Sequence, residues 1–269
     1  MDERIIGIHT LSRRYFIEII RSSRNALVEL FKKLNKECIN QKNEEVMNLL
    51  KDFNKKNPYC LIKKDISQAI LNKIEAISPE KFYSLQEIKK RIISVCEKAE
   101  IDDRTHYCDV SKELKREICN NEKQKFISHI DSIDEDYLVN IEPLFYRRVL
   151  SKEKINEIKE DINKTWYKSK LNEKDTMCFE KSYFNEKIKT DYLLAILKRK
   201  KVEKIYMVNT GGINSASYIM DISALDLYYT DGFDIYWCSD KVDWMIVESH
   251  EGFYSIYGDW LKAEIGKLI

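Results

Sequence analysis

The sequence predicts an α+β protein, in which a helical N-terminal region precedes an α/β domain with a small, mainly antiparallel sheet. Apolar residues of the first half recur at steps of three and four, which indicates amphipathic helices. After about residue 200 the apolar runs are short, aromatic and β-branched, and Gly, Asn, Asp or Ser separate them, as is typical of strands and turns. We therefore expect an all-helical region at residues 1–135 and an α+β domain at residues 136–269.

The bulk composition is that of a folded protein with a heavily charged surface, since 34% of the 269 residues are charged and 43% are hydrophobic. No apolar run approaches the roughly 18–20 residues that span a bilayer, and the first residues carry no secretory signal. The seven cysteines are odd in number and widely spaced, which favours reduced thiols over a disulfide framework. We expect a cytoplasmic protein that does not bind a membrane.

The N-terminal region shows helical periodicity. Between Tyr15 and Leu34 the apolar residues fall on one stripe, while most arginines and lysines fall elsewhere. Ser84 stands three residues before Glu87, which is the pattern of a capping box at a helix start. Prolines lie between the periodic segments, where helices break. The expected helices of this region span residues 15–34, 43–55, 64–77, 84–100 and 109–130.

The C-terminal region begins with helices and ends with strands. Ser151 precedes an early acidic residue and three spaced isoleucines, which predicts a helix at residues 151–169. A helix at 183–200 ends in a basic run that suits a helix C-terminus. Short connections between the last three strands favour an antiparallel meander. The expected strands span residues 177–179, 204–208, 218–222, 233–238, 244–248 and 253–257, and a final helix spans 260–268.

Charge is distributed unevenly along the chain. From residue 201 onward there are 5 basic and 11 acidic residues, whereas residues 1–200 carry 41 basic and 34 acidic residues. Six of the seven glycines and three of the four tryptophans also lie in this acidic final quarter. Such asymmetry points to interaction with a partner rather than to a particular reaction.

Several short motifs of the second region follow one another in a recognisable order. Residues 143–151 read Pro-Leu-Phe-Tyr-Arg-Arg-Val-Leu-Ser, and the helix that follows ends near Trp166. Further along come Asp243-Trp244, residues 249–251 (Ser-His-Glu) and residues 258–261 (Gly-Asp-Trp-Leu). Over residues 136–269 the chain resembles uncharacterised small bacterial proteins that look like those encoded beside secreted polymorphic toxins. This resemblance implies an immunity protein that binds a cognate toxin, and it supplies no catalytic residues.

The acidic and aromatic residues of the final quarter are the candidate partner-binding surface. Aromatic anchors with an acidic rim are what an interface toward a basic protein uses. In the alternative interpretation the aromatic residues are the core of a small sheet, and the acids pair with the basic helical half. The candidate residues are Asp234, Trp237, Asp240, Asp243, Trp244, Glu248, His250, Glu251 and Asp259.

No complete catalytic motif is present, so we expect a non-enzymatic protein that binds and neutralises a cognate toxin or another basic protein. The zincin pattern fails because Tyr254 stands four residues after His250, and the sequence predicts no metal site and no cofactor. One alternative is a metal-dependent hydrolase or nuclease that uses the polar residues between Asp240 and Glu251. A second is nucleic-acid binding through the basic helices, against which the interspersed carboxylates argue.

Overall fold

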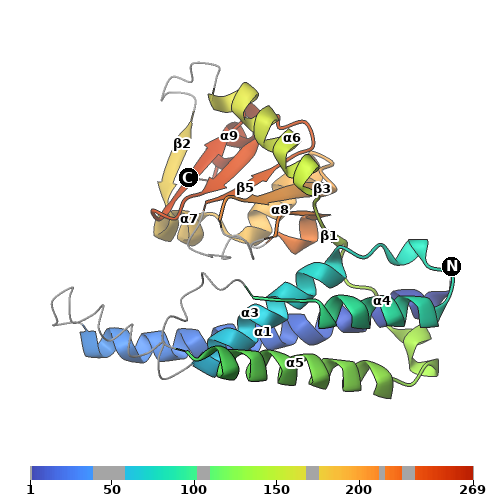
Figure 1. Cartoon of the computed structure of the whole chain (residues 1–269). Coiled ribbons are helices and arrows are strands. Elements are labelled where there is room, and N and C mark those ends of the chain that lie inside the picture. Colours follow the sequence, from blue (N-terminus) through green and yellow to red (C-terminus); the bar gives the residue numbers. More distant parts are fainter. Residues whose placement is uncertain are drawn as a thin grey trace. The chain divides into compact units, whose positions relative to one another are not determined.

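The computed structural model describes residues 2–38, 58–101, 110–167, 176–211, 216–225 and 234–268. The chain divides into two compact units, Met1–Leu144 and Phe145–Ile269, and each has its own hydrophobic core. Helices make up the described part of the first unit, and an antiparallel sheet with helices makes up the second (Figure 1). The predicted α+β class is confirmed.

Within the described residues the N-terminal unit is helical throughout. Four of the predicted helices are confirmed, and the helix expected at 43–55 lies outside the described residues. The Ser84 hydroxyl accepts a hydrogen bond from the Glu87 backbone N–H (3.2 Å), as predicted, and Ser111 caps the next helix in the same way. The elements are α1 (Glu3–Cys38), α3 (Pro58–Glu75), η1 (Pro79–Lys81), α4 (Leu85–Glu97), α5 (Lys112–Ser132) and η2 (Asp136–Asn140).

The core of this unit is built from isoleucines and aromatic rings of several helices. The rings of Phe16 on α1 and Phe126 on α5 lie 4.5 Å apart, and both side chains are fully buried. Arg13 and Glu75 form a buried ion pair of 3.1 Å between α1 and α3. An unpaired charge in a protein core strongly destabilises the fold, so this ion pair requires one alignment of α1 against α3.

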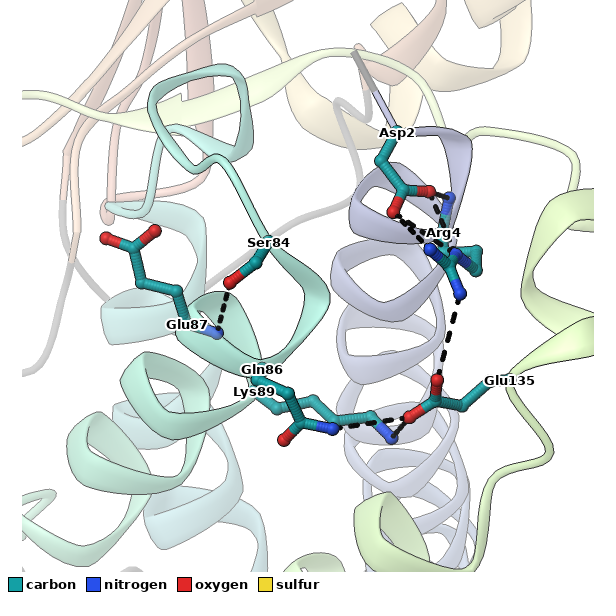
Figure 2. A network of polar contacts seen from close by, with 7 residues as sticks. All are labelled: Asp2, Arg4, Ser84, Gln86, Glu87, Lys89 and Glu135. Atoms are coloured by element: carbon teal, nitrogen blue, oxygen red, sulfur yellow. Dashed lines mark hydrogen bonds and ion pairs between the residues drawn. The ribbon is translucent and has the colours of Figure 1, made fainter.

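A polar network on the surface joins the start of α1 to α4 (Figure 2). Glu135 receives Lys89 Nζ at 3.2 Å and Gln86 Nε2 at 3.4 Å, and Arg4 Nη1 lies 3.8 Å from its other oxygen. Asp2 holds the same guanidinium through a hydrogen bond of 2.8 Å. Exposed pairs of this kind contribute little stability individually, so the network orients these segments more than it holds them together.

Gly7 fixes where the first unit ends. A Cβ at this position of α1 would lie 2.2 Å from the carbonyl oxygen of Leu138, so only glycine lets η2 pack this closely. Because η2 is packed on α1 in this way, the first unit runs to Leu144. The boundary predicted from the sequence, 135/136, lies nine residues earlier.

The C-terminal unit is built on one sheet whose described strands pair antiparallel, in the order β1-β4-β3-β5-β6-β7-β2. The predicted meander of the last three strands is confirmed by the pairing of β5, β6 and β7. The strands are β1 (Arg147–Val149), β2 (Met177–Glu180), β3 (Lys204–Asn209), β4 (Tyr218–Asp221), β5 (Ile235–Cys238), β6 (Met245–Glu248) and β7 (Phe253–Tyr257).

Both faces of this sheet are covered. One face carries Trp237, Trp244 and Ile246 and packs against three helices, α7 (Lys181–Lys187), α8 (Thr190–Arg199) and α9 (Asp259–Ile265). The other face carries Met245 and Val247 and packs against α6 (Lys152–Ile162) and the π-helical segment Asn163–Tyr167.

One expectation for this unit is wrong, and one strand was not expected. Residues 147–149 lead into α6 at Ser151, as expected, but they also form the edge strand β1 beside β4. The single helix expected at 183–200 is two helices, α7 and α8, with a break at Ile188 and Lys189. The apolar spacing continues through this break because Phe184, Ile188 and Leu193 all enter the same core.

Replacing Gly7 by alanine is expected to destabilise the protein by about 1–3 kcal/mol, because the new methyl group overlaps the backbone of Leu138. Helix propensity alone would favour alanine by about 1 kcal/mol. Urea unfolding measures the difference, and Ser22→Ala, an exposed change on the same helix, is the control. Equal or greater stability of Gly7→Ala would contradict the described packing.

Gly258 and Gly252 form a matched pair, because both have a φ of 94°. A Cβ at Gly258 would lie 2.8 Å from the Asp243 carbonyl oxygen and 2.9 Å from the Trp244 Cα, whereas one at Gly252 would meet nothing within 4 Å. Gly252→Ala should therefore cost about 1–2 kcal/mol of backbone strain alone, and Gly258→Ala about 1–3 kcal/mol more for the overlap. Urea unfolding of the two variants checks the order, and equal losses would show that Gly258 is not closely packed.

Candidate functional site

The side chains predicted to bind a partner lie at two separate ends of β6. Asp240 and Asp243 belong to the turn that precedes this strand, and His250 and Glu251 belong to the turn that follows it. Four strand residues at about 3.3 Å each place the two turns roughly 13 Å apart. The predicted residues therefore form two surfaces and not one.

Three of the predicted residues lie in the core. Trp237, Trp244 and Glu248 are each only 1% exposed, because helices cover the face of the sheet to which they point. The Glu248 carboxylate lies 2.9 Å from the ammonium of Lys181 at the start of α7. The expectation that these three side chains belong to a surface is wrong, and the alternative, a core role, holds for both tryptophans.

Asp234 organises the turn between β6 and β7. Its carboxylate accepts a hydrogen bond from the His250 backbone N–H (2.9 Å), and His250 Nδ1 lies 2.8 Å from the same oxygen. The Asp234 carbonyl accepts hydrogen bonds from the backbone N–H and the hydroxyl of Thr210, both at 3.0 Å. Through these bonds one residue connects the end of β3, the start of β5 and the β6–β7 turn.

The electrostatic surroundings of Asp234 favour its charged form. Partial burial raises the pKa of this carboxyl group, but the hydrogen bonds from the His250 backbone and ring, together with the charge of His250, outweigh that effect. The pKa of Asp234 therefore lies below its ordinary value of 3.8. The carboxylate is ionised at neutral pH and contributes negative charge to the turn.

A partly exposed aromatic ring borders this turn. Phe253 is 40% exposed, and it lies directly opposite Glu180 in the pairing of β7 with the edge strand β2. The Ser249 backbone N–H donates to the Phe253 carbonyl (2.8 Å), so Phe253 is the first residue after the turn. We define the β6–β7 corner as Glu180, Asp234, His250, Glu251 and Phe253.

The turn at the other end of β6 is tightly held. The Ser239 hydroxyl donates a hydrogen bond to the Asp243 carboxylate, and the Trp166 indole N–H donates to the Val242 carbonyl (3.1 Å). Val242 has a φ of 52°, which is unusual for a β-branched residue, and its side chain is buried. Gly258 packs against this turn, which places Asp259 at the same end of the sheet.

A pocket of about 740 Å³ opens beside this second turn. It is bounded by residues 200–206, which run from the end of α8 into β3, and by Ser239, Asp240, Lys241, Asp243 and Trp244 at the turn. Trp260 on α9 completes the wall, and its ring meets that of Trp244 edge-on at a centroid distance of 6.0 Å. Asp240 and Asp243 line this pocket together with four lysines, so here the predicted acids face basic groups.

The single cleft that a hydrolase would need is not formed, because the acids near Asp240 and the His250–Glu251 pair lie at opposite ends of β6. Across the described part of the chain, no three His, Cys, Asp or Glu side chains are grouped as metal ligands would be. Among the basic residues of α1, Arg13 is buried against Glu75 and so cannot contribute to a nucleic-acid-binding stripe.

Phe253 and the lysines of the pocket are not among the residues predicted from the sequence. Phe253 begins its strand next to a Gly-containing turn, and an aromatic residue at a strand end is the signal that marks it. The lysines come from segments some forty residues apart, and the pairing of Tyr206 with Cys238 brings those segments together. Only the pairing of the strands shows that these lysines are neighbours.

Comparison of the chain with protein-family models, with curated proteins and with solved structures gives no match. None of the helices in the described ranges is long and apolar enough to cross a membrane.

Replacing Asp234 by asparagine is expected to lower the stability at pH 7 by about 1 kcal/mol, because charge-assisted hydrogen bonds to the β6–β7 turn are weakened. A carboxylate whose folded pKa is depressed stabilises above its unfolded pKa, and this stabilisation is lost as pH falls through the folded pKa. Urea unfolding should therefore show a gap between wild type and Asp234→Asn at pH 7 that closes toward pH 3.

Asp240→Asn serves as the control, since Asp240 accepts no comparable bonds from a neighbouring turn within the described residues. A gap that stays constant between pH 7 and pH 3 would contradict the assigned role of the Asp234 carboxylate.

Proposed function

We propose that this protein is a non-enzymatic binding protein that neutralises a basic partner protein, and that the β6–β7 corner is its contact surface. The observation that carries the proposal is the partly exposed Phe253, which lies opposite Glu180 in the strand pairing and next to the turn that carries Glu251. An apolar anchor within a charged rim is the arrangement that concentrates binding energy in protein interfaces.

The charge of the corner supports a basic partner. Glu180, Asp234 and Glu251 contribute three carboxylates, and His250 is the only basic side chain of the corner as defined. The nearest ammonium along the chain, that of Lys181, lies 2.9 Å from the buried Glu248 carboxylate and is thereby neutralised. Complementary charge steers association and sets its salt dependence more than it sets affinity.

The geometry of the corner also suits recognition. Asp234 holds His250 through two contacts, and the backbone N–H of Gly252 donates to the Ser249 carbonyl (3.2 Å), so the turn is preorganised. A surface that is already ordered loses less entropy on binding. At the other end of β6 the carboxylates face lysines, which makes that end less suited to a basic partner.

The resemblance of the C-terminal motifs supports an immunity protein as the specific case, with a toxin domain encoded beside it as the partner. Many toxins that act on nucleic acids are basic, so an acidic surface with an apolar anchor is a physically reasonable inhibitor. The protein would then act in the cytoplasm by covering the toxin.

Titration of the purified product of the neighbouring gene against variants of this protein tests the proposal. Glu251→Lys should weaken the complex about tenfold at low salt, mainly through slower association, because the steering charge is reversed. Phe253→Ala should weaken it about tenfold or more, mainly through faster dissociation, because the apolar anchor is removed.

Asp240→Lys is the matched charge-reversal control, since Asp240 lies at the opposite end of β6, and it should change the affinity less than about twofold. Absence of a complex would overturn the proposal. An equal loss in Asp240→Lys and Glu251→Lys would show that the corner is not the contact surface.

A further inference from the structure

The pocket beside the β5–β6 turn concentrates positive charge in the acidic part of the chain. From residue 201 onward the sequence has only five basic residues, and three of them, Lys201, Lys204 and Lys241, line this pocket. Lys200 at the end of α8 is the fourth lysine of the lining. The lysines lie on two segments of the chain that the pairing of β3 with β5 brings together, so they become neighbours only in the folded protein.

The ammonium groups of these lysines are available to a ligand as far as the described residues show. Within the described residues none of them lies within ion-pair distance of a carboxylate. Lys204 Nζ lies 4.2 Å from the centroid of the Tyr146 ring, and Lys200 Nζ lies 5.4 Å from that of Trp260. Contacts with ring faces position these chains while leaving their N–H donors available. Lys201 and Lys241 are exposed.

The carboxylates of the pocket are fewer, and one of them is engaged. Asp243 accepts the hydrogen bond from the Ser239 hydroxyl and so stabilises the turn. Glu203 and Asp240 remain at the rim, against four lysines. The pocket therefore has an excess of donors for an anion and two acceptors for N–H groups of a ligand.

Apolar side chains form much of the remaining wall. Trp260 is half-buried and packs on Trp244, while Val202 and Ile205 contribute aliphatic surface. The volume of about 740 Å³ lies within the roughly 300–1,000 Å³ of small-molecule sites. Lysines beside an aromatic wall are a combination that suits a ligand with both a charged and a ring-shaped part.

Backbone strain is concentrated at the same place. In the described part of the chain the non-glycine residues with positive φ are Lys201 (57°) and Val242 (52°). Lys201 lines the pocket, and Val242 stands between two residues that line it. A non-glycine residue in a strained backbone conformation, which glycine would adopt without strain, is found preferentially at binding sites.

We infer that this pocket binds a small organic anion in which a flat ring is joined to a phosphate or similarly charged group. The lysines would bind the anionic part, and Trp260 would contact the ring. Asp240 or Glu203 would accept a hydrogen bond from an N–H group on the ring. The site lies at the opposite end of β6 from the β6–β7 corner, so it does not depend on the proposed partner.

Isothermal titration of the full chain with ATP, without divalent metal, tests the inference, because ATP joins a ring with amino hydrogens to a polyanion. One saturable site is expected, and its affinity should fall as salt rises. Adenosine and tripolyphosphate, each of which carries one half of the ligand chemistry, should bind at least about tenfold more weakly. No saturable binding of ATP, or equal binding of tripolyphosphate, would overturn the inference.

Lys201→Gly separates binding from folding. It removes one ammonium group, so ATP should bind about three- to tenfold more weakly, yet glycine relieves the positive φ, so the melting temperature should stay equal or rise. The double variant Lys201→Gly with Lys241→Gln should lose about tenfold or more.

Lys198→Gln is the matched control, since Lys198 is an exposed lysine near the end of α8 that does not line the pocket. It should leave ATP binding unchanged. Unaltered binding in the double variant, or an equal loss in Lys198→Gln, would show that the pocket lysines do not hold the anion.

Discussion

The packing of Trp237 and Trp244 beneath α7, α8 and α9 is the interaction on which the C-terminal unit depends. Each indole is 1% exposed, and burying an aromatic side chain of this size stabilises a fold by roughly 2–3 kcal/mol. Because these rings point to one face, Met245 and Val247 point to the other, where α6 covers them. The sheet is thus enclosed on both sides over its central strands.

Enclosure of the central strands leaves the functional surface at the strand ends. The turn after β6 presents His250 and Glu251, and Asp234 at the start of β5 holds this turn next to the partly exposed Phe253. The turn before β6 forms one wall of the lysine-lined pocket. Binding residues on loops held by a rigid scaffold are the usual arrangement in proteins, and here one strand separates two chemically different sites.

The course of the strands could be predicted from the sequence, but the direction in which their side chains point could not. The last three strands are short β-branched and aromatic runs joined by brief turns, so their meander was predictable. The burial of Trp237 and Trp244 depends on which helices cover the sheet, and that is tertiary information. One local signal was present: residues 244–247 are apolar without interruption, which is typical of a strand covered on both faces.

Other features could not be predicted for physical reasons of the same kind. The break between α7 and α8 is hidden because both helices send apolar residues into one core, so the spacing continues across it. The lysines of the pocket are distant along the chain and become neighbours only through the pairing of β3 with β5. The close approach of η2 to Gly7 is likewise a tertiary contact, which the spacing of apolar residues along the chain cannot predict.

Solvent access to the tryptophans tests this account most directly. In a variant with Trp166→Phe and Trp260→Phe, the remaining indoles are Trp237 and Trp244, and both belong to the core. The account predicts blue-shifted fluorescence with little quenching by iodide, because neither ring meets solvent. Emission at the wavelength of free tryptophan with strong iodide quenching, in a variant that retains its secondary structure by circular dichroism, would contradict it, since the two rings would then lie on a surface.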